Sequence, residues 1–326
     1  MEIRENLATR ELVLLDLNNL QKPEAFVQKM QPPGPDKVQG CPYCNSDRIL
    51  KPLASFPVEG EAPVIAYQHP RPLLSDAARA PSVKLPGYKA FAGKGIHEII
   101  VDSPLHSRVP AFYTVARYKT MLQAYRSRFV VNMSLNTPLL ILVRNCGIFA
   151  NAFVPHQCTE LITLPVVTEE VKVKQRNALG FYNATGECVF CKMRRMEMDD
   201  GSRALMESEH FSSFIPYASL EPFHLWILPK RHSSSFGSIS DDEIADLALH
   251  LKTLLLKFYH GLGNPAYNLV IESFPMNLGA VESYHWYCFL LPRLNQASGF
   301  VLGSGMHASN VLPEDCARFL RDVKIQ

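Results

Sequence analysis

The sequence has no long uncharged apolar run and no strong excess of one charge. The nearest approach to a membrane span, Pro138 to Val143, is far shorter than the roughly 20 residues that a helix needs to cross a bilayer. Lys and Arg total 33 against 31 Asp and Glu, a net charge of +2, which disfavours nucleic-acid binding by bulk charge. The N-terminus mixes both charges and has no apolar core, so it is not typical of a secretory signal. We therefore expect a cytoplasmic protein without a membrane span or a nucleic-acid partner.

The chain has enough apolar material for a substantial core. Apolar residues make up 47% of its 326 residues and charged residues 20%, as is usual for a globular protein. A disulfide scaffold is not needed at this size. The eight cysteines are expected to be reduced in the absence of a secretory signal, so pairs of them indicate metal ligands more than disulfides.

The order of the cysteine, histidine and proline motifs occurs twice. In each half a Cys-x-x-Cys pair is followed by a strand that ends in Pro and His, and later by a His before a strand that ends in Leu-Pro. The first half contains Cys41-Pro-Tyr-Cys44, Pro104 with His106, and His156 with Leu164-Pro165. The second half contains Cys188-Val-Phe-Cys191, Pro229 with His232, and His285 with Leu291-Pro292. This order indicates two related halves.

The elements between these motifs also correspond. Ser240-Asp-Asp-Glu243 is a capping box, and the apolar residues that follow at helical spacing predict a helix that ends at Gly261. A strand is predicted at residues 267–272, and the first half has a comparable helix at 115–129 and a comparable strand at 139–143. Each half is therefore expected to be an α+β unit with an antiparallel sheet and one long helix. We place the halves at residues 1–175 and 176–326.

Two sets of four side chains are candidate metal ligands. A Cys-x-x-Cys turn brings two thiolates to the separation that tetrahedral zinc needs, and two histidines from distant strands complete a Cys2His2 set. The first set is Cys41, Cys44, His106 and His156, and the second is Cys188, Cys191, His232 and His285. Four protein ligands close the coordination sphere, so both zinc ions would be structural. The alternatives are redox-active pairs and buried free thiols.

At these residues the chain resembles the galactose-1-phosphate uridylyltransferase family of the histidine-triad superfamily. It resembles most the two-zinc branch that includes plant adenylyl-sugar phosphorylases. The segments that carry the likeness are residues 6–10, 41–44, 95–107, 164–167, 186–191, 226–232, 285–286, 303–305 and 313–314. The resemblance implies two histidine-triad-like halves that form an incomplete barrel, and it implies that all eight ligands lie where the family has metal ligands. It also suggests a homodimer.

The family transfers a nucleotidyl group through a covalent intermediate on a histidine, and this chain departs from the motif that does so. The family motif is His-x-His-x-Gln, in which the first His binds metal, the second is the nucleophile and the Gln donates a hydrogen bond to phosphate. This chain reads His156-Gln-Cys158-Thr-Glu160. The resemblance therefore places Cys158 at the nucleophile position and Glu160 at the glutamine position.

Both replacements work against the family reaction. A thiolate can attack phosphorus, but Cys has an ordinary pKa of about 8.5 and needs electropositive surroundings. Glu160 puts a carboxylate where the family has a neutral donor, and at ~4 Å with an effective dielectric of ~20 its repulsion of a phosphate is about 4 kcal/mol. The approach loop also becomes bulky, through Phe149 and the segment Phe153-Val-Pro155.

Other residues of the presumed cleft have less specific roles. Arg144 and Asn145 are candidates for phosphate contact, although a strand end also suits structural residues. A family segment that helps to hold the nucleotide appears here as Tyr67-Gln-His-Pro-Arg71, in which only the proline clearly remains. His69, in this segment, is a candidate for ligand contact.

Three hypotheses follow for the function. The first is a zinc-containing relative of the family that has lost nucleotidyl-histidine catalysis and binds a partner, a nucleotide sugar or a sugar phosphate. The second is an active nucleotidyltransferase or phosphorylase on a nucleoside-diphosphate sugar, with Cys158 as the nucleophile. The third is a structural subunit of a larger assembly that uses only the fold.

Overall fold

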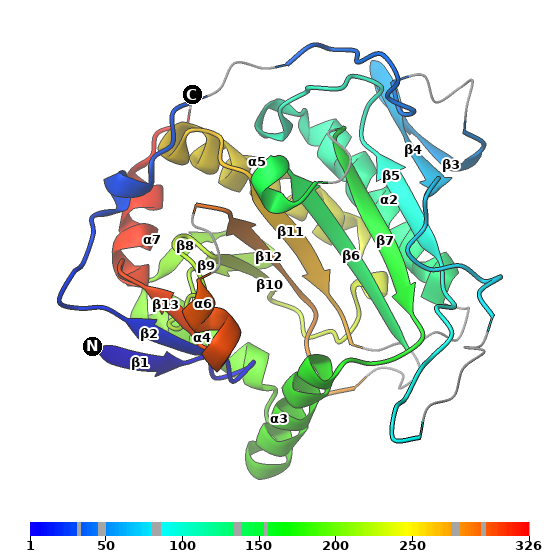
Figure 1. The fold of residues 1–326 in the computed structure, drawn as a ribbon. Coiled ribbons are helices and arrows are strands. Elements are labelled where there is room, and N and C mark those ends of the chain that lie inside the picture. Colours follow the sequence, from blue (N-terminus) through cyan, green and yellow to red (C-terminus); the bar gives the residue numbers. More distant parts are fainter. Residues whose placement is uncertain are drawn as a thin grey trace.

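One ten-stranded antiparallel sheet contains most of the strands (Figure 1). The computed structural model describes residues 1–30, 34–44, 50–79, 86–133, 138–152, 156–274, 281–294 and 298–325. In spatial order the first five strands are β3 (Pro52–Val58), β4 (Glu61–Gln68), β5 (His97–Val101), β7 (Cys158–Leu164) and β6 (Leu139–Cys146). The next five are β11 (Tyr267–Glu272), β12 (Tyr287–Pro292), β10 (Leu225–Pro229), β9 (Phe211–Phe214) and β8 (Ala204–Glu207).

The strand order is the same when it is followed inward from either edge of this sheet. It reads β3-β4-β5-β7-β6 from one edge and β8-β9-β10-β12-β11 from the other, and the two series meet at the β6–β11 pair. At this junction Asn145 lies opposite Asn268. The predicted α+β class is confirmed, and the sheet is open because β3 and β8 are unclosed edges.

The other described elements are helices and the strands of a second, smaller sheet. The helices are α2 (Val115–Met133), α3 (Glu169–Thr185), α4 (Val189–Asp200), α5 (Asp241–Leu262), α6 (Gly299–Ser304) and α7 (Pro313–Asp322). The short 3-10 helices are η1 (Pro23–Phe26), η2 (Pro110–Phe112), η3 (Ile148–Ala150) and η4 (Phe236–Ser238). A small second sheet joins β1 (Glu2–Glu5), β2 (Leu12–Leu15) and β13 (His307–Ser309). The division proposed at residue 175 falls inside α3 and stays a prediction.

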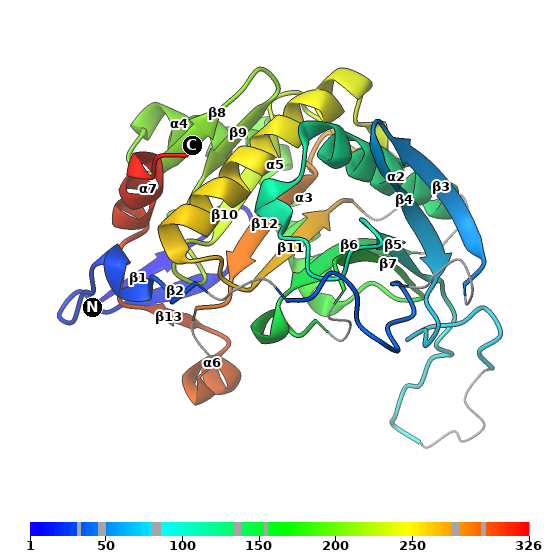
Figure 2. The same cartoon turned by 90° about the horizontal axis from the view of Figure 1, so that it is seen from above.

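The two long helices α2 and α5 lie against one face of the large sheet (Figure 2). Successive side chains of a strand point to opposite faces, so Leu140 and Leu142 of β6 are buried toward these helices. The alternate side chains Val143 and Asn145 point to the other face and are half-buried. We call the half-buried middle of that other face, formed by Val143, Asn145, Glu160 and Val270, the central open face.

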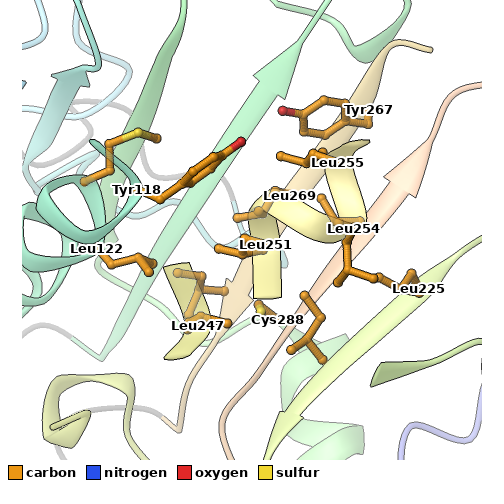
Figure 3. Packing of buried hydrophobic residues seen from close by; sticks show 14 of the residues in the cluster. Tyr118, Leu122, Leu225, Leu247, Leu251, Leu254, Leu255, Tyr267, Leu269 and Cys288 are labelled. Atoms are coloured by element: carbon orange, nitrogen blue, oxygen red, sulfur yellow. The ribbon is translucent and has the colours of Figure 1, made fainter. Parts of the chain in front are cut away.

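The core between α5 and the sheet follows the predicted helical spacing (Figure 3). Leu247, Leu251, Leu254 and Leu255 of α5 pack against residues of α2 and of strands β10, β11 and β12. The predicted capping box is present, since Ser240 accepts from the Glu243 amide while Glu243 accepts from the Ser240 amide. The predicted end at Gly261 is wrong by two residues. Gly261 is buried inside the helix, and Gly263, with φ of 78°, is the residue whose left-handed conformation ends it.

A buried histidine of α5 predicts acid sensitivity of the fold. Burial lowers the pKa of His250 to about 4, whereas an unfolded histidine has a pKa of about 6.5. The unfolded chain therefore binds more protons between these values, and the free energy of unfolding should fall by about 3 kcal/mol as the pH drops from 6.5 to 4. Urea unfolding at several pH values measures this loss. In the variant His250→Gln the free energy of unfolding should depend less on pH. An equal pH dependence in wild type and variant would show that His250 is not the source of the acid sensitivity.

No helix among the described residues combines the length and the apolar character that a membrane span requires.

Candidate functional site

The first predicted set of Cys and His side chains converges in the structure. Cys41 and Cys44 lie in a turn before β3, His106 follows β5, and His156 precedes β7. All four are buried, and one ligand atom of each lies within 4.8 Å of the others. The separation along the chain is large, so it is the pairing of β5 with β7 that brings the two histidines together.

The distances in this cluster fit a tetrahedral metal site. Sγ of Cys44 lies 3.3 Å from Nδ1 of His106, and Sγ of Cys41 lies 3.6 Å from Nδ1 of His156. A tetrahedron with Zn–S of about 2.3 Å and Zn–N of about 2.05 Å has an S···N edge of about 3.6 Å. Nε2 of His156 donates to the Ser103 carbonyl at 2.7 Å, which leaves the lone pair of Nδ1 facing the sulfurs. The donor set therefore suits zinc.

The second set is only partly brought together. Cys188 caps α4, Cys191 lies in its first turn, and Sγ of Cys191 is 3.3 Å from Nδ1 of His232. These three side chains form one group, to which His285 does not belong. The His285 ring lies 5.2 Å from the His232 ring at 87°, much as His156 lies 5.3 Å from His106 at 87°. Nδ1 of His285 donates to the Trp286 carbonyl, and its buried Nε2 has no hydrogen-bond partner among the described residues.

The two thiols of this second set differ, because the pKa of Cys188 is lowered and that of Cys191 is raised. Hydrogen bonding from Cys191 and from His232 holds the pKa of Cys188 below its usual range. Metal binding requires a deprotonated thiol, so this environment favours the ligand form of Cys188.

Cys158, at the predicted nucleophile position, is a buried thiol. It is 6% exposed and packs beside Cys41 and Cys44 under the first cluster. Burial raises its pKa well above the ordinary value, the Asp102 carboxylate raises it further, and Arg144 lowers it only in part. Because the attacking species is the thiolate, this environment opposes nucleophilic attack by Cys158.

Arg144 is held inside the protein by a carboxylate. Its Nη1 lies 2.6 Å from Oδ2 of Asp102, and its Nη2 donates to Oε1 of Gln157 at 2.8 Å. The side chains of Arg144 and Asp102 are 3% and 0% exposed. Tyr113 also donates to Asp102. The geometry favours the structural interpretation of Arg144 over phosphate contact.

Glu160 lies at the central open face and is bound by a histidine that the sequence reasoning missed. Nε2 of His97 is 2.8 Å from Oε2 of Glu160, and Nδ2 of Asn145 donates to Oε1 at 3.4 Å. The His69 ring stacks on the His97 ring at 4.1 Å and 9°. His97 is at the first position of β5 and Glu160 is in β7, so only the register of two strands far apart in sequence reveals the contact.

Phe149, in the approach loop, is less obstructive than the sequence predicts. The Phe149 side chain is 67% exposed and therefore does not fill the space beside Cys158. Phe153, Val154 and Pro155 lie outside the described residues.

Comparison with known proteins agrees with the resemblance. The chain is 28% identical to ADP-glucose phosphorylase of Arabidopsis thaliana, over 99% of this chain and 93% of that protein. It is 21% identical to galactose-1-phosphate uridylyltransferase of Thermotoga maritima, over 100% and 99%. A crystal structure of the A. thaliana ADP-glucose phosphorylase with bound ADP-glucose superposes with a TM-score of 0.82 at 25% identity, covering 100% of this chain and 99% of that one. The chain is similar over nearly its whole given length to ADP-glucose phosphorylase and to the galactose-1-phosphate uridylyltransferases.

This relationship extends to both ends of the chain. No family model matches the sequence. The likeness to the uridylyltransferases and to ADP-glucose phosphorylase therefore stands on whole-chain similarity together with the shared fold.

Proposed function

We propose that the protein binds a nucleotide sugar or a sugar phosphate without forming a covalent nucleotidyl intermediate. The observation that carries this proposal is the state of Cys158, which is buried and has a raised pKa at the position where the family has its nucleophile. Glu160 adds a negative charge at the position of the phosphate-binding glutamine. The relatives act on, or bind, ligands of this class by name.

The proposal includes two structural zinc ions and two histidine-triad-like halves. Cys41, Cys44, His106 and His156 would hold the first ion, and the tetrahedral S···N distances support that assignment. Cys188, Cys191 and His232 would hold the second, with His285, whose ring lies 5.2 Å from the His232 ring, as the fourth ligand. A bound zinc ion would tie a Cys-x-x-Cys segment to two distant histidines. The repeated strand order supports halves at residues 1–175 and 176–326 that form an incomplete barrel.

A second candidate function is an active phosphorylase on a nucleoside-diphosphate sugar. The 28% identity to ADP-glucose phosphorylase over nearly the full chain favours it. In that case the Cys158 thiolate would form a bond to the α-phosphorus while sugar 1-phosphate leaves, and inorganic phosphate would then take the nucleotidyl group. The buried, protonated thiol is the feature that opposes this route.

A turnover assay separates the two candidates. The protein is mixed with ADP-glucose and inorganic phosphate, and ³¹P NMR follows the appearance of glucose 1-phosphate and ADP, with UDP-glucose in a parallel sample. We expect calorimetric binding of a nucleotide sugar with no turnover above that of a buffer control. Catalytic release of glucose 1-phosphate that is lost in Cys158→Ala would overturn the proposal and establish the phosphorylase.

A further inference from the structure

The side chains around Glu160 form an arrangement of hydrogen-bonding groups that differs from a phosphate site. The Glu160 side chain is 16% exposed at the central open face, while His97 behind it is 1% exposed. Arg144, the nearby cation of β6, is committed to Asp102. A phosphate placed next to this carboxylate would be repelled by its negative charge.

The two stacked histidines carry their protons on Nε2. The Leu73 amide donates to Nδ1 of His97 at 3.1 Å, and the Arg71 amide donates to Nδ1 of His69 at 3.1 Å. A neutral imidazole that accepts at Nδ1 holds its proton at Nε2. Nε2–H of His97 therefore donates to Glu160, and Nε2–H of His69 is left without a hydrogen-bond partner among the described residues.

This proton assignment argues against a metal ion at the same place. Ligand atoms of His69, His97 and Glu160 lie within 4.8 Å of one another, as in a metal site. A metal bound to both Nε2 atoms would require both protons to move to Nδ1, which would break the two backbone hydrogen bonds. A ligand that uses the Nε2–H groups as donors keeps them.

The carboxylate of Glu160 still has room for two donors. An ionised carboxyl group offers about four lone-pair sites. His97 uses one on Oε2, and Asn145 uses one on Oε1. The Asn145 amide is held in this orientation because its Oδ1 accepts from Asn268 at 2.7 Å. One lone pair on each oxygen is therefore not used by a hydrogen bond to the described residues.

We propose that Glu160 and His69 recognise a vicinal pair of sugar hydroxyls, on the ribose or the hexose ring of the ligand, and that Asn145 positions the Glu160 carboxylate. This inference rests on the proposed binding function. Each hydroxyl donates to one oxygen of Glu160, and one hydroxyl oxygen accepts from Nε2–H of His69. A carboxylate that binds a ribose hydroxyl is a common device in nucleotide-binding proteins, and hydrogen bonds to ionised groups are the stronger kind. Glu160 is then a specificity residue for sugar rather than a remnant of a phosphate site.

Isothermal titration calorimetry with ADP-glucose tests whether the Glu160 carboxylate strengthens or weakens ligand binding. The variant Glu160→Gln keeps an oxygen that accepts from His97, so the fold is retained. We expect it to bind ADP-glucose about 10-fold more weakly, because a charged acceptor is lost. A phosphate site predicts the opposite, since the amide removes repulsion and restores a donor. His69→Phe keeps the stack on His97 and removes the Nε2–H donor, and it should also weaken binding.

Two deoxy ligands identify the ring that is recognised. Loss of the relevant hydroxyl, in 2′-deoxy-ADP-glucose or in ADP-2-deoxyglucose, should weaken wild-type binding about 10-fold and change binding to Glu160→Gln much less. The exposed Glu170→Gln on α3 makes the same change of charge and should leave binding unchanged. Three results would overturn the inference. Glu160→Gln could bind ADP-glucose more tightly than the wild type, or could weaken the binding of all three ligands equally. The third result is that the wild type does not bind ADP-glucose. Turnover of ADP-glucose would instead overturn the proposed function.

Discussion

Replacement of Cys44 by Ala is expected to lower the free energy of unfolding more than any other single cysteine change in the first half. Structural zinc contributes about 10–16 kcal/mol to the folding of small zinc domains. A loss of even about a third of that, 3 to 5 kcal/mol, is a large share of the ~5–15 kcal/mol that stabilises a typical protein. Cys44 faces both histidines of its cluster, so its removal opens the coordination sphere. Thermal unfolding with and without a zinc chelator measures the effect.

The matched control for this change is Cys316→Ala. Cys316 is a buried thiol in α7 outside both clusters. The substitution therefore removes a sulfur atom, as in Cys44→Ala, but no candidate metal ligand. We expect a cost of about 1 kcal/mol and no added sensitivity to the chelator. If Cys44→Ala and Cys316→Ala were equally stable, and the chelator did not destabilise the wild type, the zinc assignment would be wrong.

Removal of the Asp102 carboxylate is the second large effect that we expect. Asp102→Ala leaves the buried guanidinium of Arg144 without its charge partner, and breaking a buried pair in this way costs about 3–5 kcal/mol. The Tyr113 hydroxyl also loses its acceptor. Urea unfolding should show a large drop in the midpoint with little change in the slope.

A double variant distinguishes the cost of an unpaired charge from a simple packing defect. In Asp102→Ala with Arg144→Met no buried charge remains, and we expect at least half of the lost stability to return. Additive losses in the double variant would show that the pair does not act as a buried ion pair.

The sequence predicts the local elements of this fold well. The strand at Tyr267–Glu272 and the start of α5 at its capping box are found where the residues place them, because both depend on contacts within a few positions. The end of α5 is predicted at Gly261, whereas the structure ends the helix at Gly263. Gly261 remains helical because its small size allows close contact with Phe319 and Val323 near the C-terminus.

The candidate site could be predicted only where a residue type is chemically distinctive. The Cys-x-x-Cys pairs and their histidines are recognisable as motifs, and seven of the eight side chains converge. His97 and Asp102 could not be assigned in the same way. Their roles depend on the register of β5 with β7 and on the burial of Arg144 in the core. No local sequence pattern predicts either feature.

Intact-mass analysis of the protein tests whether Cys158 forms a covalent nucleotidyl intermediate. The protein is mixed with an excess of ADP-glucose, or of UDP-glucose, quenched within seconds and weighed, with Cys158→Ala treated in parallel. We expect one unmodified mass for the wild type with either ligand, because the buried Cys158 thiol does not attack phosphorus. A wild-type nucleotidyl adduct that is absent from Cys158→Ala would contradict it.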